Sequence, residues 1–165
     1  VREALQLLSQ QNLVQIVPSN GTFVAPIDRE NMKYVYEMLA ALSVISLEMC
    51  YDKLTPQHFI KMTALNEIFL QHIDTTNLSA IHQADYDFHH YLCEISGNPY
   101  LLDFFSSLYL QVVRNENFYF KGAPKFQASY TCHQGIISAL QNGDLKKAQT
   151  LIADNWHSSI PSETE

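Results

Sequence analysis

The sequence predicts a mainly α-helical protein, an antiparallel six-helix bundle preceded by a partial winged helix-turn-helix. From position 28 onward, apolar residues recur every three or four positions, as on one face of a helix. Short connections containing proline, glycine or asparagine separate these periodic stretches, which favours antiparallel neighbours. The chain has 165 residues, of which 47% are hydrophobic and 16% charged, a composition that excludes a disordered protein.

The first 26 residues have a different pattern. Val1–Gln10 carries a short apolar stripe typical of an amphipathic helix. Two β-rich runs, Leu13–Val17 and Thr22–Ala25, flank the turn Pro18–Gly21, which contains an Asn-Gly pair. A helix followed by a hairpin is what remains of a winged helix-turn-helix when its first two helices are removed. The expected domains are therefore this remnant at 1–26, a helical domain at 27–160 and a frayed tail at 161–165.

Local signals place the ends of the six helices. Thr55-Pro56 combines a capping residue with proline at the first helical position, and Gly97 is a stop signal. Asp28 and Asp144 are expected as N-caps. The segment 121–124 breaks the helical pattern. The expected helices are approximately 28–52, 55–72, 78–95, 98–118, 126–141 and 144–157.

Charge, hydropathy and cysteine content limit the partners and the cellular compartment expected for this chain. The formal net charge is −7, which argues against a nucleic-acid footprint over the whole surface. No apolar run is expected to reach the roughly 18 residues of a membrane span, and no signal peptide is visible. The three cysteines are far apart and form no CxxC pair, as expected for buried thiols in a reducing compartment. A cytoplasmic protein without membrane contact is expected.

Two polar residues lie on the apolar face of the helix expected at 78–95. Asp85 and His89 are four residues apart, so they lie one above the other. The stripe that they share also contains Ile81, Phe88, Leu92 and Ile95. A carboxylate and an imidazole that point into an apolar interior need a partner. Either they satisfy each other or they hold a cation together.

Two later histidines could complete a metal site. His133 lies in a stripe with Tyr130, Ile137 and Leu140, and His157 follows Trp156 on the last helix. Together with Asp85 and His89, they offer one carboxylate and three imidazoles, a donor set that suits zinc, nickel or manganese. The alternative is that each histidine is an ordinary hydrogen-bonded core residue. No role is assigned to His58, His72, His82 and His90.

Several short motifs occur in a characteristic order. They are Val1-Arg2-Glu3-Ala4-Leu5, Leu13-Val14, Gly21-Thr22-Phe23-Val24-Ala25-Pro26, Asp85-x-x-Phe88-His89-x-x-Leu92, Gly97-Asn98-Pro99-x-Leu101-Leu102, His133-x-x-Ile136-x-x-Ala139-Leu140 and Asn142-Gly143-Asp144-x-x-x-Ala148. In this order and at these spacings, the chain resembles the GntR-family bacterial transcriptional regulators of the FadR subfamily, which carry an FCD effector domain. The resemblance covers nearly the whole chain.

The resemblance implies a function for the helical domain. In this family, the D-x3-H pair and two later histidines bind a divalent metal, here Asp85, His89, His133 and His157. Zinc is the expected ion, and nickel and manganese are alternatives. The metal would lie at the bottom of a pocket for a small carboxylate metabolite, the effector. Many relatives have an arginine and a glutamate near where this chain has Leu39 and Ser43. Without that arginine, the carboxylate of an effector would lack the second binding partner that it usually has besides the metal.

The resemblance also implies a DNA-binding side. Val1–Gln10 corresponds to the recognition helix of the winged domain, in which Arg2 matches a DNA-contacting position, and Asn20 and Gly21 lie at the tip of the wing. The expected partners are operator DNA, in a protein that has the upstream helices, and a second copy of the chain in a homodimer. The chain as it stands is expected to bind DNA weakly or not at all.

Two other function classes are weighed against the regulator. A metal-dependent hydrolase needs a general base near the metal, but the nearest extra carboxylate, Asp87, points away from the Asp85–His89 pair. The chain is therefore not expected to be an enzyme. An all-α interaction module with purely structural Asp and His residues is the other alternative. It predicts that a chelator leaves the stability of the protein unchanged.

Overall fold

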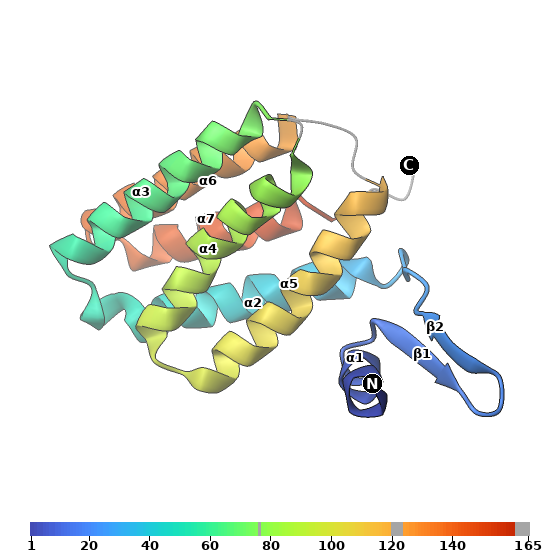
Figure 1. The fold of residues 1–165 in the computed structure, drawn as a ribbon. Helices are drawn as coiled ribbons and strands as arrows, with labels where there is room; N and C mark the ends of the chain where they lie inside the picture. Colours follow the sequence, from blue (N-terminus) through green and yellow to red (C-terminus); the bar gives the residue numbers. More distant parts are fainter. Residues whose placement is uncertain (76, 120–123, 161–165) are drawn as a thin grey trace.

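Seven α-helices, a 3₁₀ turn and a two-stranded hairpin form the described part of this computed structural model, which covers residues 1–75, 77–119 and 124–160 (Figure 1). The prediction of a mainly α-helical fold with a partial winged helix is confirmed. The elements are α1 (Arg2–Gln10), β1 (Val14–Val17), β2 (Gly21–Val24), α2 (Met32–Cys50), η1 (Tyr51–Lys53), α3 (Pro56–Ile73), α4 (Leu78–Ser96), α5 (Pro99–Tyr119), α6 (Pro124–Gln141) and α7 (Leu145–His157).

The hairpin has the form that its turn residues dictate. β1 and β2 are antiparallel, with Val14 opposite Val24 and Val17 opposite Gly21. The three-residue loop between them has Ser19 at φ +62° and is followed by Gly21 at φ +122°. A backbone angle of +122° is unfavourable for any residue with a Cβ, so glycine is required at this position.

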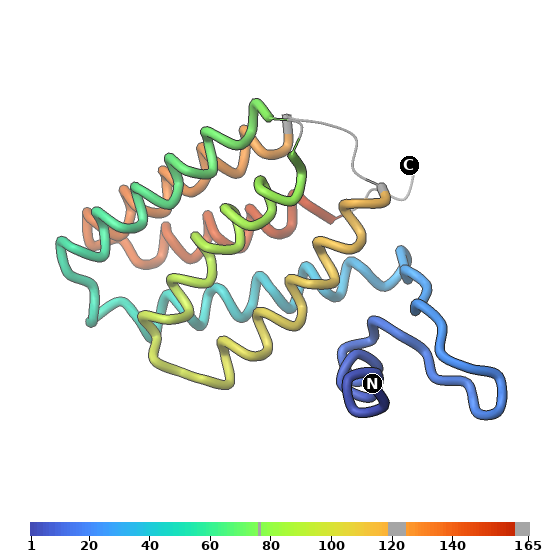
Figure 2. Tube along the Cα trace, viewed as in Figure 1, coloured from blue at the N-terminus to red at the C-terminus, as the bar shows by residue number. Residues whose placement is uncertain are grey.

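α1 and the hairpin lie outside the bundle, beside α5 (Figures 1 and 2). Two side chains of α5 hold them there through backbone carbonyls. The Gln111 amide donates to the carbonyl of Gln11 at 2.7 Å. The Arg114 guanidinium donates to the carbonyl of Asn12 at 2.9 Å and to that of Ala25 at 2.7 Å. Arg114 therefore joins the two ends of the hairpin to the helical bundle.

α4 is the central helix of the bundle. It packs against α2, α3 and α5, while α6 packs against α3 and α7, and α7 packs against α2. Residues of α4 take part in each of the three hydrophobic clusters, through Phe88 and Leu92, through Cys93, and through Ile81 and Ala84. A polar residue on the inward face of α4 is therefore surrounded by the other helices.

Most predicted helix ends are confirmed. Thr55 caps α3 in a capping box with His58, and Asp144 caps α7 by accepting from the backbone N–H of Lys147. α4 ends at Gly97, whose φ of +70° is the left-handed conformation expected of a C-terminal glycine. These signals act within a few residues along the chain, which is why the sequence alone reveals them.

The start and the buried face of α2 differ from the prediction. Asp28 is not the N-cap, because Asn31 has that position and Asp28 accepts hydrogen bonds from the Asn31 backbone and side chain. The apolar periodicity of the helix expected at 28–52 places Ile45 and Met49 on its inner stripe, but in the structure they are 44% and 39% exposed. The reason is that α2 packs against three helices and turns Ala40, Ser43 and other small side chains inward. The predicted tail at 161–165 and residues 121–123 of the break predicted at 121–124 lie outside the described residues, whereas Pro124 is the first residue of α6.

The segment Met32–Lys53 corrects the expectation that no stretch resembles a membrane span. Its mean hydropathy of 1.2 over an 18-residue window and its length of 22 residues would allow a span by composition alone. In the fold, this segment forms α2 and η1, and α2 packs against α4, α5 and α7. An apolar helix at the centre of a helical bundle has the same composition.

Candidate metal centre

Asp85 and His89 lie on the inward face of α4, as predicted. They are one helical turn apart, and the Asp85 Oδ1 and His89 Nε2 atoms are separated by 4.0 Å. The His89 side chain is buried, with 1% of the residue exposed. This placement follows from the shared stripe, because Phe88 and Leu92 beside the pair are fully buried.

α6 brings a third ligand-type side chain to the pair. His133 Nε2 lies 3.1 Å from His89 Nε2 and 3.7 Å from Asp85 Oδ1. One potential ligand atom from each of the three residues falls within 4.8 Å of the others. We call Asp85, His89 and His133 the metal group. The structure thus unites three of the four residues predicted to bind a metal.

Aromatic side chains enclose the two imidazoles. The His133 ring stacks on Phe88 at a centroid distance of 4.0 Å, and the His89 ring lies 4.6 Å from that of Trp156. Burial lowers the pKa of His89 to about 3 and holds the pKa of His133 well below its ordinary value. Both imidazoles are therefore neutral at physiological pH, which is the form that binds metals.

The carboxylate of Asp85 is also perturbed by burial. Burial raises the pKa of Asp85 to about 7, although the hydrogen bond from Tyr109 acts in the opposite direction. The Tyr109 hydroxyl lies 2.9 Å from Asp85 Oδ2 and 2.8 Å from the His82 carbonyl oxygen. Oδ2 is thus anchored to α5, while Oδ1 faces the two imidazoles.

A second contact orients His133. Its Nδ1 atom lies 2.9 Å from Asn66 Oδ1 on α3, while the Asn66 amide donates to the carbonyl of Tyr130. The Asn66 oxygen can only accept, so the proton of the neutral His133 ring is on Nδ1. The lone pair of Nε2 then points at His89 and Asp85. Support of this kind is usual for metal-binding histidines.

His157 does not join the metal group, which corrects the sequence prediction. It is exposed on α7, whereas Asn155 is 8% exposed and places its amide nitrogen 3.5 Å from His89 Nε2. Two residues along a helix correspond to a rotation of about 200°, so the two side chains point in opposite directions. Ala148, Ile152 and Asn155 are buried and lie three or four positions apart, and this spacing in the sequence indicates that position 155 faces the interior.

His82, to which the sequence patterns assign no role, is a further candidate functional residue in the structure. It is 3% exposed, with Nδ1 3.7 Å from Glu116 Oε2. Its burial depends on α5 and α6, which contribute Glu116 and Phe126 to its surroundings. No local spacing could reveal this long-range packing.

A small cavity adjoins the metal group. It measures ≈ 20 Å³, about the volume that one water molecule needs. Its lining includes Asp85, Asn155, Glu116 and Lys125. Glu116 is buried and pairs with Lys125 while it accepts from the Tyr36 hydroxyl at 3.0 Å. The lining therefore contains both signs of charge.

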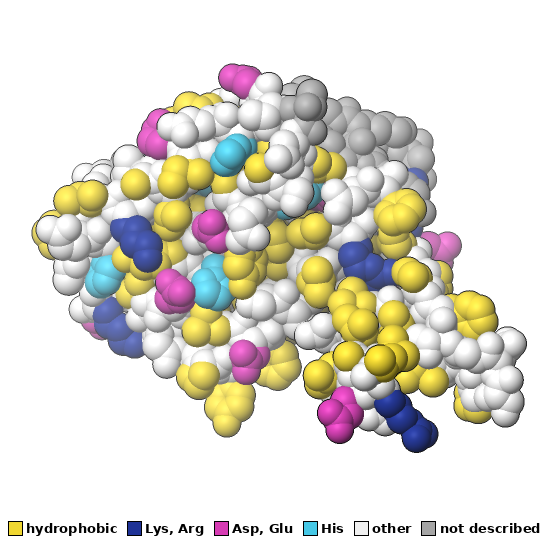
Figure 3. All heavy atoms as spheres, viewed as in Figure 1, with side chains coloured by type: hydrophobic (Ala, Val, Ile, Leu, Met, Phe, Trp, Pro, Cys, Tyr) yellow, Lys and Arg dark blue, Asp and Glu magenta, His cyan; other side chains and the backbone are white. Residues whose placement is uncertain are grey.

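The three predicted DNA-contacting residues lie outside the bundle. Arg2 is exposed at the start of α1, Asn20 is exposed in the hairpin loop, and Gly21 begins β2. α1 has no buried residue, and hydrophobic side chains gather over it and the neighbouring end of α5 (Figure 3). The fold thus keeps all three residues at the surface of the small N-terminal unit.

Comparison with known proteins identifies the helical domain. The family model of the FCD domain matches residues 34–157, which are most of the chain. The chain belongs to the FCD-domain family. A comparison with curated proteins finds no significant match.

Solved structures share the fold of this FCD-domain protein at low sequence identity. Escherichia coli McbR/YncC has a TM-score of 0.85 and 17% identity, with 97% of this chain and 81% of that chain covered. Lar, described as controlling the Listeria monocytogenes agr system, has a TM-score of 0.76 and 17% identity, with coverage of 95% and 75%. A GntR-family transcriptional regulator from Pseudomonas syringae has a TM-score of 0.62 and 16% identity, with coverage of 96% and 66%.

These comparisons confirm two predictions made from the sequence: the helical part of the chain is an FCD domain, and its fold is shared by solved structures described as GntR-family transcriptional regulators.

Proposed function

We propose that this chain senses a small metabolite for a DNA-binding regulator, and that its helical domain holds a divalent metal ion through Asp85, His89 and His133. The observation that supports this most directly is the convergence of the three donor atoms in the interior of the bundle. Neutral imidazoles and a carboxylate are the donors that zinc, nickel and manganese accept. Zinc is the ion that we expect.

The distances within the metal group fit such an ion. Zinc bonds to nitrogen or oxygen are about 2.0–2.2 Å, so tetrahedral neighbours are about 3.3–3.6 Å apart. The three separations are 3.1, 3.7 and 4.0 Å, which bracket that range. A bound ion would supply positive charge to which an anionic oxygen of the effector can bind. Asp85 and the two imidazoles would position it, and the aromatic walls would limit the access of water.

A small carboxylate is the effector class that we propose. Leu39 is fully buried and apolar, and the Ser43 hydroxyl accepts a hydrogen bond from Trp156 Nε1 at 2.9 Å. Neither residue therefore provides a cation that could bind a carboxylate. Lys125, which pairs with Glu116, is a cation at the cavity beside the metal group. A carboxylate bound near Asn155 could share this charge. The ≈ 20 Å³ cavity requires side chains to move when the effector enters, which could couple binding to the packing of α6 and α7.

The DNA-binding role rests on the N-terminal unit. We propose that Arg2, Asn20 and Gly21 face operator DNA when the complete winged domain is present, with two copies of the chain forming a homodimer. Arg2 and the loop residue Asn20 are exposed, as such contacts require. The expected location is the cytoplasm.

A hydrogen bond between the imidazoles is the alternative use of the metal group. His89 Nε2–H could donate to His133 Nε2 across 3.1 Å, which would satisfy both atoms without a metal. In that case, the residues would be purely structural and the protein would be a metal-independent module. The two proposals differ in how the stability of the protein responds to a chelator.

Thermal unfolding with and without zinc tests the proposal. After dialysis against EDTA, zinc at 100 times its dissociation constant should stabilise the wild type by about 2.7 kcal/mol. For a chain of this size, that corresponds to a rise in Tm of about 5–10 °C. The shift should be absent in Asp85→Asn and His133→Gln but kept in His157→Gln, the matched control. An equal Tm with and without zinc in the wild type supports the hydrogen-bonded alternative.

The effector class is tested by the same measurement. Succinate should raise the Tm of the zinc-loaded wild type further and have a smaller effect on zinc-loaded Lys125→Gln. Without zinc, succinate should have no effect on either protein. A succinate effect that is independent of zinc would contradict the proposed binding mode.

A further inference from the structure

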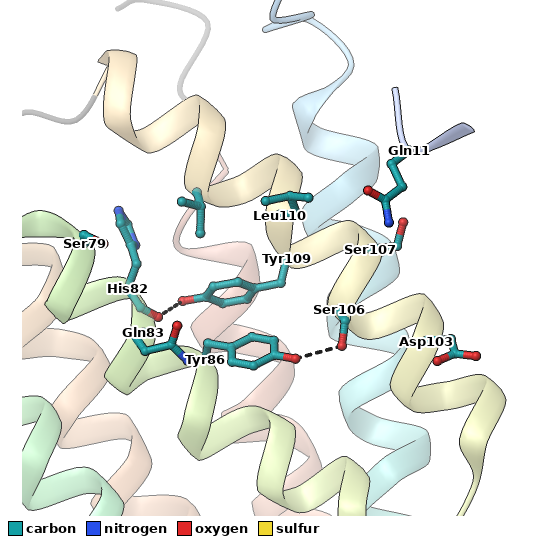
Figure 4. Close-up of a pocket in the computed structure, with 11 residues that line it drawn as sticks. Gln11, Ser79, His82, Gln83, Tyr86, Asp103, Ser106, Ser107, Tyr109 and Leu110 are labelled. Carbon is teal, nitrogen blue, oxygen red and sulfur yellow. Dashed lines mark hydrogen bonds between the residues drawn. The ribbon is translucent and has the colours of Figure 1, made fainter. Parts of the chain in front are cut away.

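A second, larger pocket opens between α4 and α5. Its volume is ≈ 590 Å³, and its lining includes Gln11 from the end of α1 (Figure 4). None of the three residues of the metal group lines it. We call it the junction pocket, because α4 and α5 of the bundle and the N-terminal unit all contribute to it.

The lining combines flat aromatic surface with hydrogen-bonding groups. The rings of Tyr86 and Tyr109 lie side by side between α4 and α5, with centroids 5.1 Å apart (Figure 4). The Tyr86 hydroxyl lies 2.8 Å from Ser106 Oγ, so its position is fixed. Leu110 and Val113 add apolar surface. Further polar lining comes from Gln11, Ser79, Gln83 and Ser107.

The charge of the lining limits the ligands that fit. Among the described residues that line the pocket, Asp103 carries the only acidic side chain, and no lysine or arginine is present. A carboxylate or phosphate would find no cationic partner there. A ligand that is uncharged or positively charged suits this lining, and a cation could pair with the exposed Asp103.

His82 supplies a buried hydrogen-bonding atom without a partner. The residue is 3% exposed and lines both the junction pocket and the small cavity beside the metal group, and its buried Nε2 atom has no hydrogen-bond partner within the described parts of the chain. Buried polar atoms are nearly always paired, so Nε2 can gain a partner when an occupant of the junction pocket displaces the side chains that cover this atom.

The surroundings of His82 also indicate which partner is missing. Burial lowers the pKa of His82, so the ring is neutral and carries one proton. Nδ1 faces the Glu116 carboxylate at 3.7 Å, which favours the proton on Nδ1 and leaves Nε2 as an acceptor. The missing partner is therefore a donor, such as a hydroxyl or an amine N–H.

We propose that the junction pocket binds a small uncharged or cationic molecule with a flat apolar part and a hydroxyl or amine donor for His82. The junction pocket shares His82 and Tyr109 with the small cavity beside the metal group, but none of the three residues of the metal group lines it, and this second binding site goes beyond the proposed function. An occupant would contact α4, α5 and Gln11 together. Because Gln111 and Arg114 of α5 hold the segment around Gln11, binding would stiffen the joint between the bundle and the DNA-binding unit.

Tyramine is a suitable probe, since it combines a phenol ring, a hydroxyl and an ammonium group. Its matched anion is 4-hydroxyphenylacetate, which has a similar shape and carries a carboxylate instead of the ammonium. Binding of each to the 165-residue chain is measured by NMR titration in EDTA, so that the result does not depend on the metal. We expect tyramine to bind at least about tenfold more tightly than the anion.

Three variants locate the site. Ser107→Trp fills the pocket and should weaken tyramine binding at least about tenfold, whereas Ser138→Trp, on an exposed position of α6, should leave it within about twofold. His82→Phe keeps a ring but removes the acceptor and should also weaken binding. Circular dichroism of each variant verifies folding, and Ser107→Trp tests the site even if His82→Phe fails to fold.

Three results would overturn the proposal. These are no saturable binding of tyramine at millimolar concentration, equal binding of the anion, and binding that persists in folded Ser107→Trp. Failure of the metal proposal would leave all of these measurements unaffected, because every titration contains EDTA.

Discussion

Replacement of Asn155 by histidine should increase the affinity of the protein for zinc. The Asn155 amide nitrogen lies 3.5 Å from His89 Nε2, so a histidine there would point at the metal group. The ≈ 20 Å³ cavity beside Asn155 gives space for part of the larger ring. The wild type would hold the ion through three side chains, and the variant through four, which is the usual number at a structural zinc site.

The size of the gain follows from the number of ligands. A four-ligand structural zinc site binds with an apparent free energy of about 10–16 kcal/mol, or roughly 3 kcal/mol per ligand. The contact that Asn155 makes with His89 is worth about 1 kcal/mol at most and is lost. A net gain of about 2 kcal/mol corresponds to about a 30-fold lower Kd.

The assay is competition for zinc against a chelating dye at pH 7, with Tm verifying that each variant is folded. Asn155→Gln is the matched control, because it lengthens the side chain without adding an imidazole. His157→Ala should bind zinc like the wild type, since His157 is exposed. A folded Asn155→His variant with unchanged or weaker zinc affinity would refute the inference that a side chain at position 155 faces the bound metal ion.

Two further predictions concern pH and the joint between the units. In EDTA, the free energy of unfolding should fall by about 1–3 kcal/mol per pH unit below pH 6.5, because on unfolding His89 and His133 each take up a proton, His82 takes up part of one, and Asp85 releases one. The histidines have lowered folded pKa values, so their contribution is present above 6.5 and lost as pH falls; Asp85, with a folded pKa of about 7, acts in the opposite direction. Urea unfolding at pH 7, 6 and 5 measures this slope, and a flat profile would contradict it. Arg114→Ala should speed amide hydrogen exchange in β1 and β2 about tenfold or more, since two hydrogen bonds to the unit are lost. Unchanged exchange would show that Arg114 does not hold the hairpin.

The sequence predicts those parts of the fold that depend on neighbouring residues. The Thr55-Pro56 start, the Gly97 stop and the Asp144 cap are correct because each acts within one helical turn. The inward direction of Asp85 and His89 is correct for a related reason. They share a stripe with large apolar residues on the same helix, so one periodicity places them all.

Long-range packing accounts for the features that the sequence did not reveal. The burial of His82 requires α5 and α6, and the orientation of His133 requires Asn66 from α3. The error at His157 is of a different kind. The spacing of the buried residues in α7 predicts that Asn155 and not His157 points inward, whereas a position next to Trp156 does not distinguish between the two neighbours.

Metal content measures the central claim most directly. The protein is purified without chelator, incubated with zinc, passed through a desalting column and analysed by elemental mass spectrometry beside the double variant Asp85→Ala/His89→Ala. We predict about one zinc ion per chain in the wild type and none in the variant, as one three-residue metal group implies. Absence of metal from both proteins, also after incubation with nickel or manganese, would contradict the claim and leave the two imidazoles as a hydrogen-bonded pair of the core.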